Sequence, residues 1–172
     1  TRCIHVVRSP AATSDKYWYF INIHLSAYDS SGNLRSQQLE FIRSLMEDLY
    51  DAGNYVIAGG DWNSLFPGTD IDTFGAYTTK EENLFWIQSI PKDWTPEGWQ
   101  WAVDPSAPSC RTLDKPYVKG ENLGVLIDGF LLSPNLTAVS VKTLDLQFKD
   151  SDHNPVIVQV TAGSTSPASS PR

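Results

Sequence analysis

The sequence has few cysteines and no long hydrophobic run. Of its 172 residues, only Cys3 and Cys110 are cysteines, so it contains neither a Cys-x-x-Cys metal motif nor a dense disulfide framework. The longest apolar stretch, residues 124–132, is interrupted by Asp128 and Gly129. It falls short of the roughly 18–20 residues that a membrane-spanning helix needs, so we expect no transmembrane segment in this chain.

Positive charge is also scarce. The chain has 13 Lys and Arg residues against 20 Asp and Glu residues, which gives a net charge of −7. This balance argues against a dedicated nucleic-acid-binding protein, which would present a basic surface to the phosphate backbone. Residues 1–10 lack the features of a signal peptide, and there is no initiator methionine. We therefore expect the sequence to begin within a longer chain.

What the sequence does contain is enough apolar material for a folded core. Hydrophobic residues make up 41% of the chain and aromatic residues 12%, including six Trp. This composition excludes a disordered, collagen-like or coiled-coil protein. The length corresponds to one domain, or part of one, and we expect it to span residues 1–161. Residues 162–172 are rich in Ser and Pro and are predicted to form a disordered tail.

The first third of the chain has a strand-helix-strand pattern. Residues 3–7 and 17–25 are rich in β-branched and aromatic side chains and are predicted to form a hairpin. A short buried strand is expected at residues 55–58, parallel to the second strand of the hairpin. Between them Gly53 stands where a helix C-cap is expected, after apolar residues at helical spacing, which are Leu39, Ile42, Leu45, Met46 and Leu49. The pattern indicates an α/β fold.

The middle of the chain, residues 61–120, is predicted to be mostly loop. It is rich in Gly, Pro, Trp and Asn, has short helical patterns at residues 81–90 and 97–102, and shows no clear strands. A loop segment of this length commonly frames a functional site. Its Trp residues could stack on bases or insert into a membrane interface, although a small packed core is the more common use of such residues, which are Trp62, Trp86, Trp94, Trp99 and Trp101. The sheet is expected to end with three strands, residues 125–132, 138–148 and 156–160.

Polar residues with catalytic chemistry follow or interrupt the predicted strands, at His24, Asp61, Asn63, Asp128 and the pair Asp152-His153. Each has an ordinary structural interpretation, such as a turn, a helix cap or a hydrogen-bonded histidine. Together they suit a phosphate ester, because Asp can hold a cation or orient water, Asn can donate to a phosphoryl oxygen, and His can move a proton. Mg²⁺ or Mn²⁺ fits these oxygen ligands better than Zn²⁺.

Four short motifs carry a resemblance to a known family. In chain order, they are Asn22-Ile23-His24-Leu25, Gly60-Asp61-Trp62-Asn63, Ile127-Asp128-Gly129-Phe130 and Ser151-Asp152-His153-Asn154-Pro155. They resemble successive motifs of the endonuclease/exonuclease/phosphatase superfamily, whose fold is the DNase I-like two-sheet α/β sandwich. A further stretch, His24 to Asp29 followed by an Arg-x-x-Gln helix at residues 35–38, is similar to the bacterial branch of that superfamily.

The resemblance implies a role for each motif residue. His24 would contact the scissile phosphate or leaving group, with Asp128 orienting it. Asp61 would position the attacking water or a metal, and Asn63 would bind phosphoryl oxygens. Asp152 would be a metal ligand or orienting acid, and His153 the general base or transition-state stabiliser. Arg111, in Pro108-Ser109-Cys110-Arg111, is similar to a substrate-binding arginine of inositol polyphosphate 5-phosphatases, although the spacing differs and a structural arginine is the more common case.

The resemblance covers only the C-terminal part of that domain. It implies an N-terminal half, absent from this sequence, which holds a metal-binding Asn on one strand and a metal-binding Glu on the next. We therefore expect the C-terminal part of a divalent-metal-dependent phosphoesterase. Its substrate would be a small organic phosphate, a lipid headgroup or a nucleic acid, and the net charge slightly favours the first two. The alternative is a non-catalytic fragment or protein-interaction module that has lost the metal site.

Overall fold

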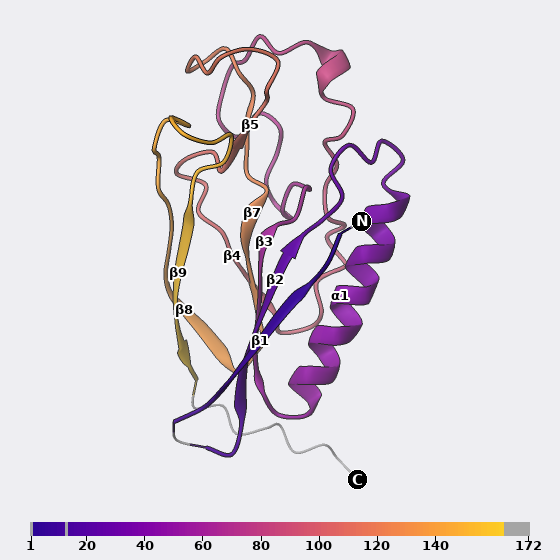
Figure 1. Cartoon of the computed structure of the whole chain (residues 1–172), viewed down its shortest axis with the longest axis vertical. Helices are drawn as coiled ribbons and strands as arrows, with labels where there is room; N and C mark the ends of the chain where they lie inside the picture. The colour runs from indigo at the N-terminus through magenta and orange to yellow at the C-terminus, as the bar shows by residue number, and fades with distance from the viewer. Residues whose placement is uncertain (1, 13, 164–172) are drawn as a thin grey trace.

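A computed structural model describes residues 2–12 and 14–163, in which one long helix and two layers of strands support a loop-rich end (Figure 1). The expected tail at residues 162–172 lies mostly outside the described residues. No helix among those described is long and apolar enough to cross a membrane. The elements in chain order are β1 (His5–Pro10), β2 (Tyr17–His24), α1 (Asn33–Asp51), β3 (Tyr55–Asp61), a 3₁₀ turn (Glu81–Asn83), β4 (Gln100–Ala102), β5 (Cys110–Arg111), β6 (Gly124–Val125), β7 (Asp128–Leu132), β8 (Leu136–Thr143) and β9 (Val156–Ala162).

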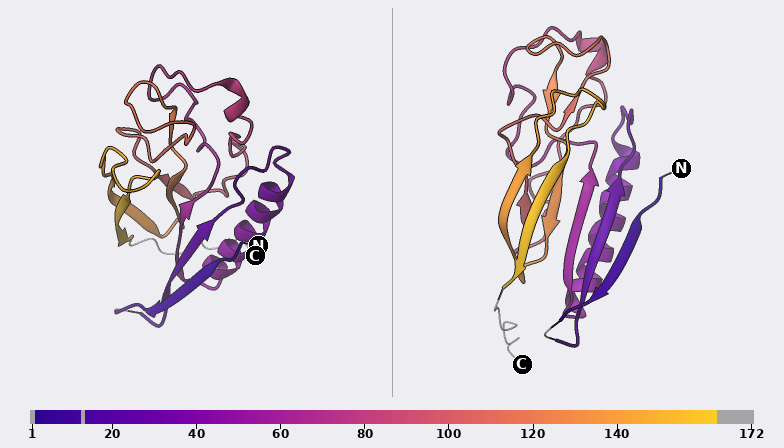
Figure 2. Two further views of the ribbon diagram at one scale, coloured as in Figure 1. Left: turned by 45° about the horizontal axis from the view of Figure 1, so that its top comes forward. Right: turned by 60° about the vertical axis from the view of Figure 1, so that its left-hand side comes forward.

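The main sheet has the strand order β1-β2-β3-β7-β4. Strands β2 and β3 are parallel because α1 connects them, and the other pairs in this sheet are antiparallel. Helix α1 covers one face of the sheet, and the antiparallel pair β8–β9 lies against the other (Figure 2). The described chain is therefore arranged in three layers.

Side chains that point alternately to the two faces of the main sheet form two separate hydrophobic cores. On the helix side, Ile21 and Ile23 of β2 and Val56 of β3 pack against Ile42 and Met46 of α1. On the opposite side, residues of β3, β4, β7, β8 and β9 form a second cluster that includes Ile57, Ala102, Leu132, Leu136 and Val158. Because side chains on a strand point alternately to the two faces, these two cores determine which face each strand-end residue occupies.

The predicted hairpin, helix and parallel pairing in the first third of the chain are confirmed. The hairpin strands are shifted by up to three residues, and the helix carries its predicted apolar side chains on its buried face. The expectation that the Trp residues of the loop region pack internally is also confirmed for Trp62, Trp94 and Trp99, which are 0%, 5% and 7% exposed.

The predictions for the rest of the chain need correction. The predicted helix at residues 81–90 is only the 3₁₀ turn, and residues 97–102 form a turn that leads into β4. Strands β4 and β5 lie in a segment predicted to have none, because strands of two or three residues carry too short a pattern to detect.

The final strands also differ from the prediction. The strand expected at residues 125–132 is interrupted between β6 and β7, and the one expected to reach residue 148 ends at Thr143. Strands β8 and β9 do not extend the main sheet but form a separate layer beside it. This separation brings the loop before β9 over the ends of the main sheet, where the predicted catalytic residues lie.

Candidate active site

Three predicted site residues form a row across adjacent strands. The strand register places His24 of β2 beside Asp61 of β3, and Asp61 beside Asp128 of β7. All three point to the face of the sheet covered by β8–β9, because they are in phase with Ile57 and Leu132 on that face. Gly60 allows β3 to lie close to β2 at this point, since a Cβ on residue 60 would collide with the carbonyl oxygen of Ile23 in β2.

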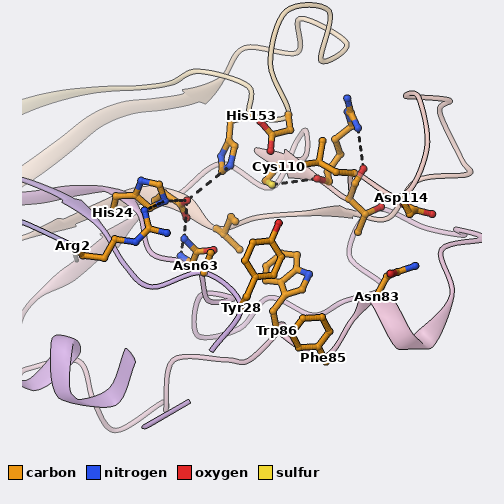
Figure 3. A pocket seen from close by; sticks show the side chains of 17 residues that line it. Arg2, His24, Tyr28, Asn63, Asn83, Phe85, Trp86, Cys110, Asp114 and His153 are labelled. Carbon is orange, nitrogen blue, oxygen red and sulfur yellow. Dashed lines mark hydrogen bonds and ion pairs between the residues drawn. The ribbon is translucent and has the colours of Figure 1, made fainter. Parts of the chain in front are cut away.

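The fourth residue, His153, comes from the loop before β9. Its Nδ1 lies 2.8 Å from Oδ2 of Asp128, which fixes the orientation of the imidazole ring. Nε2 of His153 faces Oδ2 of Asp61 at 3.9 Å, and Nε2 of His24 lies 3.3 Å from that same oxygen. Asp61 therefore stands between two imidazole rings. Figure 3 shows the rings of His24 and His153 on the same side of the cavity.

The structure gives Asp128 a different histidine partner from the one that the resemblance implies. The resemblance paired Asp128 with His24, but the structure pairs Asp128 with His153, and His24 approaches Asp61 instead. The reason is the strand register, which places Asp61 between His24 and Asp128 in the row. The loop before β9 brings His153 into contact with Asp128. The other roles implied by the resemblance remain predictions.

The loop that carries His153 is held by buried polar contacts. Asn154 is 2% exposed, donates from its backbone N–H to the Ser109 carbonyl at 2.7 Å, and donates from Nδ2 to the Pro108 carbonyl at 2.9 Å. Ser109, fully buried, accepts through Oγ the backbone N–H groups of Ile127 and Asp128, both at 3.0 Å. One serine and one asparagine thus join the segments that present Asp128 and His153.

Asp61 and His153, at the centre of the site, both have shifted pKa values. Burial, followed by the nearby charge of Asp128, raises the pKa of Asp61, and the backbone N–H of Asn63 opposes this rise. For His153, burial lowers the pKa, but hydrogen bonds to Asp128 and Cys110 outweigh it and raise the pKa to about 11. At neutral pH His153 is therefore a cation facing Asp61.

Asn63 supports Asp61 directly. Its backbone N–H donates to Oδ1 of Asp61 at 2.8 Å, and its Nδ2 donates to Oδ2 of Asp61 at 2.9 Å and to the Leu25 carbonyl at 3.0 Å. Both N–H groups of the side-chain amide are thereby used. The structure gives Asn63 an orienting contact to Asp61, and its donation to a phosphoryl oxygen stays a prediction.

These side chains open into a cavity of about 530 Å³ (Figure 3). Of the predicted residues, His24, Asp61, Asn63, Asp152 and His153 line it, and Asp128 lies behind His153. Arg111 also lines the cavity, but its Nη1 donates to the carbonyls of Thr112 and Lys115, at 3.0 Å and 3.5 Å. These contacts resemble those of a structural arginine, so binding of substrate phosphate by Arg111 remains a prediction.

The sequence did not identify several residues at the cavity. Arg2 places Nη1 at 3.0 Å from Nε2 of His24. Buried Cys110 contributes to the pKa of His153, and Tyr28 and Phe85 form part of the wall. Only Cys110 had a signal in the sequence, its place beside Arg111 in the resembling loop. The others depend on contacts between distant segments.

The described residues alone do not fit a complete metal site. No three His, Cys, Asp or Glu side chains among them are grouped closely enough to hold an ion. Both oxygens of Asp61 are already bonded to Asn63, and Nδ1 of His153 is bonded to Asp128. The proposed ligand pair Asp61 and Asp152 would thus need additional ligands from outside the described residues.

Comparison with solved structures identifies the fold. The chain aligns with an endonuclease/exonuclease/phosphatase from Beutenbergia cavernae at a TM-score of 0.59 and 21% identity, over 94% of this chain and 40% of that one. It aligns with the APE2 catalytic domain of Xenopus laevis at a TM-score of 0.56 and 17% identity, covering 95% and 57%. A Bacteroides thetaiotaomicron mannosyl-6-phosphatase gives 0.56 and 13%, covering 93% and 57%. No family model and no curated protein matches the sequence.

The chain therefore has the DNase I-like fold of endonuclease/exonuclease/phosphatase proteins, and the resemblance seen in the motifs is confirmed at the level of the fold. It spans 40–57% of the length of these three structures, consistent with a partial domain.

Proposed function

We propose that this chain is the C-terminal part of a divalent-metal-dependent phosphoesterase. The observation that carries the proposal is the meeting of His24, Asp61 and His153 at one cavity, with His153 fixed by a 2.8 Å contact to Asp128 behind it. Titratable groups with displaced pKa values that converge in a cavity are typical of catalytic sites. The similarity to structures named as an endonuclease/exonuclease/phosphatase and as a phosphatase supports hydrolysis of a phosphate ester.

The proposed chemistry follows from the charge of each group. Because its pKa is raised to about 11, His153 is protonated at neutral pH and is suited to stabilise developing negative charge on a phosphoryl oxygen, rather than to accept a proton. Asp61 faces both imidazole rings and is suited to orient the attacking water and accept its proton. His24, whose side chain is 56% exposed, can reach the leaving group.

Dependence on Mg²⁺ or Mn²⁺ is proposed from the resemblance and from the oxygen-rich residues of the motifs. Such an ion would supply positive charge for the phosphoryl group. Since the described residues do not form its complete site, the proposal places the remaining ligands on N-terminal strands of the same domain.

The test compares this chain with a version extended at its N-terminus by the sequence encoded upstream. Hydrolysis of bis(p-nitrophenyl) phosphate and p-nitrophenyl phosphate is measured with Mg²⁺, with Mn²⁺ and with a chelator. We expect metal-dependent turnover in the extended protein. Absence of turnover in both forms, beside an active reference enzyme, would overturn the proposal and favour a non-catalytic interaction module.

Site variants in the active form test the assignments. His153→Ala and Asp61→Asn should each reduce kcat by roughly 10²- to 10⁴-fold, the range for loss of one acid-base or electrostatic group. His5→Ala is the matched control, because His5 is exposed on β1 and does not line the cavity. Circular dichroism distinguishes loss of chemistry from loss of folding.

A further inference from the structure

One wall of the cavity is formed by aromatic side chains from two distant loops. Tyr28 follows β2, and Phe85 and Trp86 follow the 3₁₀ turn. Tyr28 and Phe85 are 65% and 51% exposed, and their ring centroids lie 6.2 Å apart with planes inclined by 30°. Figure 3 shows the three rings together, opposite His153. A cluster of exposed aromatic side chains beside a polar site is a common feature of ligand-binding sites.

A single buried arginine holds these two loops together. Arg35, on the first turn of α1, is 1% exposed. Its Nη2 donates to the carbonyl of Trp86 at 2.8 Å and to that of Asp29 at 3.0 Å, and its Nη1 donates to the carbonyl of Ser26 at 3.1 Å. The guanidinium thus bonds to the loop on either side of Tyr28 and to Trp86 itself. The backbone of the two loops that carry the aromatic rings is therefore held in place before any ligand arrives.

Two glutamines reinforce the same arrangement. Gln38, one turn after Arg35, bonds to the backbone N–H and the hydroxyl of Ser26, both at 3.0 Å. Gln88, two residues after Trp86, donates to the carbonyls of Asp29 and Ser30. Tyr28 itself has a φ of 55°, in the left-handed region that a tyrosine rarely adopts. A strained residue that is over-determined by its neighbours is commonly found at a ligand site.

We propose that Tyr28, Phe85 and Trp86 form a stacking platform that selects a phosphate ester carrying a flat aromatic ring, such as a nucleobase. The proposal rests on the proposed function, since the ester group would lie at His24, Asp61 and His153. Stacking needs no basic surface, so this selection suits a chain with a net charge of −7. A platform fixed in advance costs less ordering on binding than flexible loops would.

The test measures binding rather than turnover. Isothermal titration calorimetry on this chain compares adenosine 5′-monophosphate, phenyl phosphate and ribose 5-phosphate. Adenosine monophosphate should bind roughly 5- to 100-fold more tightly than ribose 5-phosphate, the range for stacking of one base on aromatic side chains. Phenyl phosphate binding as tightly as adenosine monophosphate would show that any aryl ring suffices. Weaker binding of phenyl phosphate than of adenosine monophosphate would show that the platform requires a nucleobase.

Variants of the platform provide the decisive comparison. The double variant Tyr28→Ala/Phe85→Ala should bind adenosine monophosphate no better than ribose 5-phosphate, while Tyr28→Phe should retain the preference. Equal affinity of the two phosphates for the native chain, absence of binding by either, or a preference that survives the double variant would each overturn the inference. Selective binding without hydrolysis in the extended protein would overturn the proposed function and leave the platform intact.

Discussion

Nδ1 of His153 lies 2.8 Å from Oδ2 of Asp128, across two layers of the fold. Asp128 begins β7 in the main sheet, whereas His153 belongs to the loop before β9 in the second layer. This contact therefore joins the layers at the cavity and controls the charge of the imidazole. Removal of the Asp128 carboxylate should therefore change the titration of His153.

Asp128→Asn should lower the pKa of His153. The native pKa is raised to about 11, and among its causes the hydrogen bond to Asp128 is the largest that raises it. A neutral amide keeps a similar shape but removes the negative charge. Titration of the histidine ring resonances by NMR measures the change, with Asp51→Asn, at the far end of α1, as control. An unchanged His153 titration in Asp128→Asn would contradict the assignment.

The buried hydroxyl of Ser109 predicts a stability effect. Ser109→Ala leaves the backbone N–H groups of Ile127 and Asp128 without their acceptor, at a cost of ~1–3 kcal/mol for each buried donor. Urea unfolding should show this loss, whereas Ser36→Ala, at an exposed position of α1, should change the free energy of unfolding by less than ~0.5 kcal/mol. Equal effects of the two substitutions would show that the two bonds to Ser109 carry no net stability.

The part of the fold that could be predicted from the sequence is the part with long periodic patterns. Helix α1 repeats its apolar residues over several turns, and β2 and β3 are long enough to show strand composition. Strands β4, β5 and β6 have two or three residues, so their pairing depends on neighbours brought close by the fold. Long local patterns were therefore predictable, and short paired strands were not.

The candidate site likewise has a part that the sequence predicts and a part that depends on the folded structure. Each polar strand-end residue is visible in the sequence, but the partner of Asp128 depends on the register between β3 and β7 and on the separate layer of β8–β9. The sequence indicated Trp86 as a residue able to stack, but not its grouping with Tyr28 and Phe85, because Arg35 and Trp86 are 51 residues apart and only the folded chain brings them together. Residue types indicated the chemistry, and the contacts between them required the structure.

Asp104 predicts how stability depends on pH in acid. It lies after β4 and accepts the backbone N–H of Thr143, at the end of β8, at 2.8 Å. Burial acts to raise its pKa, but the N–H groups of Thr143 and Ser106 lower it below the ordinary value of 3.8. A carboxyl group with a lowered folded-state pKa contributes stability above its unfolded pKa, and this contribution is lost as pH falls through the folded-state value.

The stability difference between the native chain and Asp104→Asn should therefore be constant above about pH 5 and shrink below the unfolded pKa of 3.8. Urea unfolding at a series of pH values measures it. Asp93→Asn, at an exposed position, serves as control for general charge effects. A difference that is independent of pH down to 2 would contradict the hydrogen-bonded carboxylate.

Arg35→Lys should destabilise the protein although it preserves the charge. The planar guanidinium reaches three carbonyls that lie on two loops, and a single ammonium group at the end of a shorter side chain cannot reach all three. Each lost charge-assisted hydrogen bond costs roughly 1.5–3 kcal/mol. Arg43→Lys is the matched control, because Arg43 lies on the same helix and makes a partly exposed ion pair with Glu47 at 3.5 Å, which is worth at most ~1 kcal/mol. Urea unfolding gives the stability change, and hydrogen exchange at residues 26–30 and 85–88 reports whether the two loops have loosened. Equal stability and equal exchange in both variants would show that Arg35 does not hold the aromatic wall together.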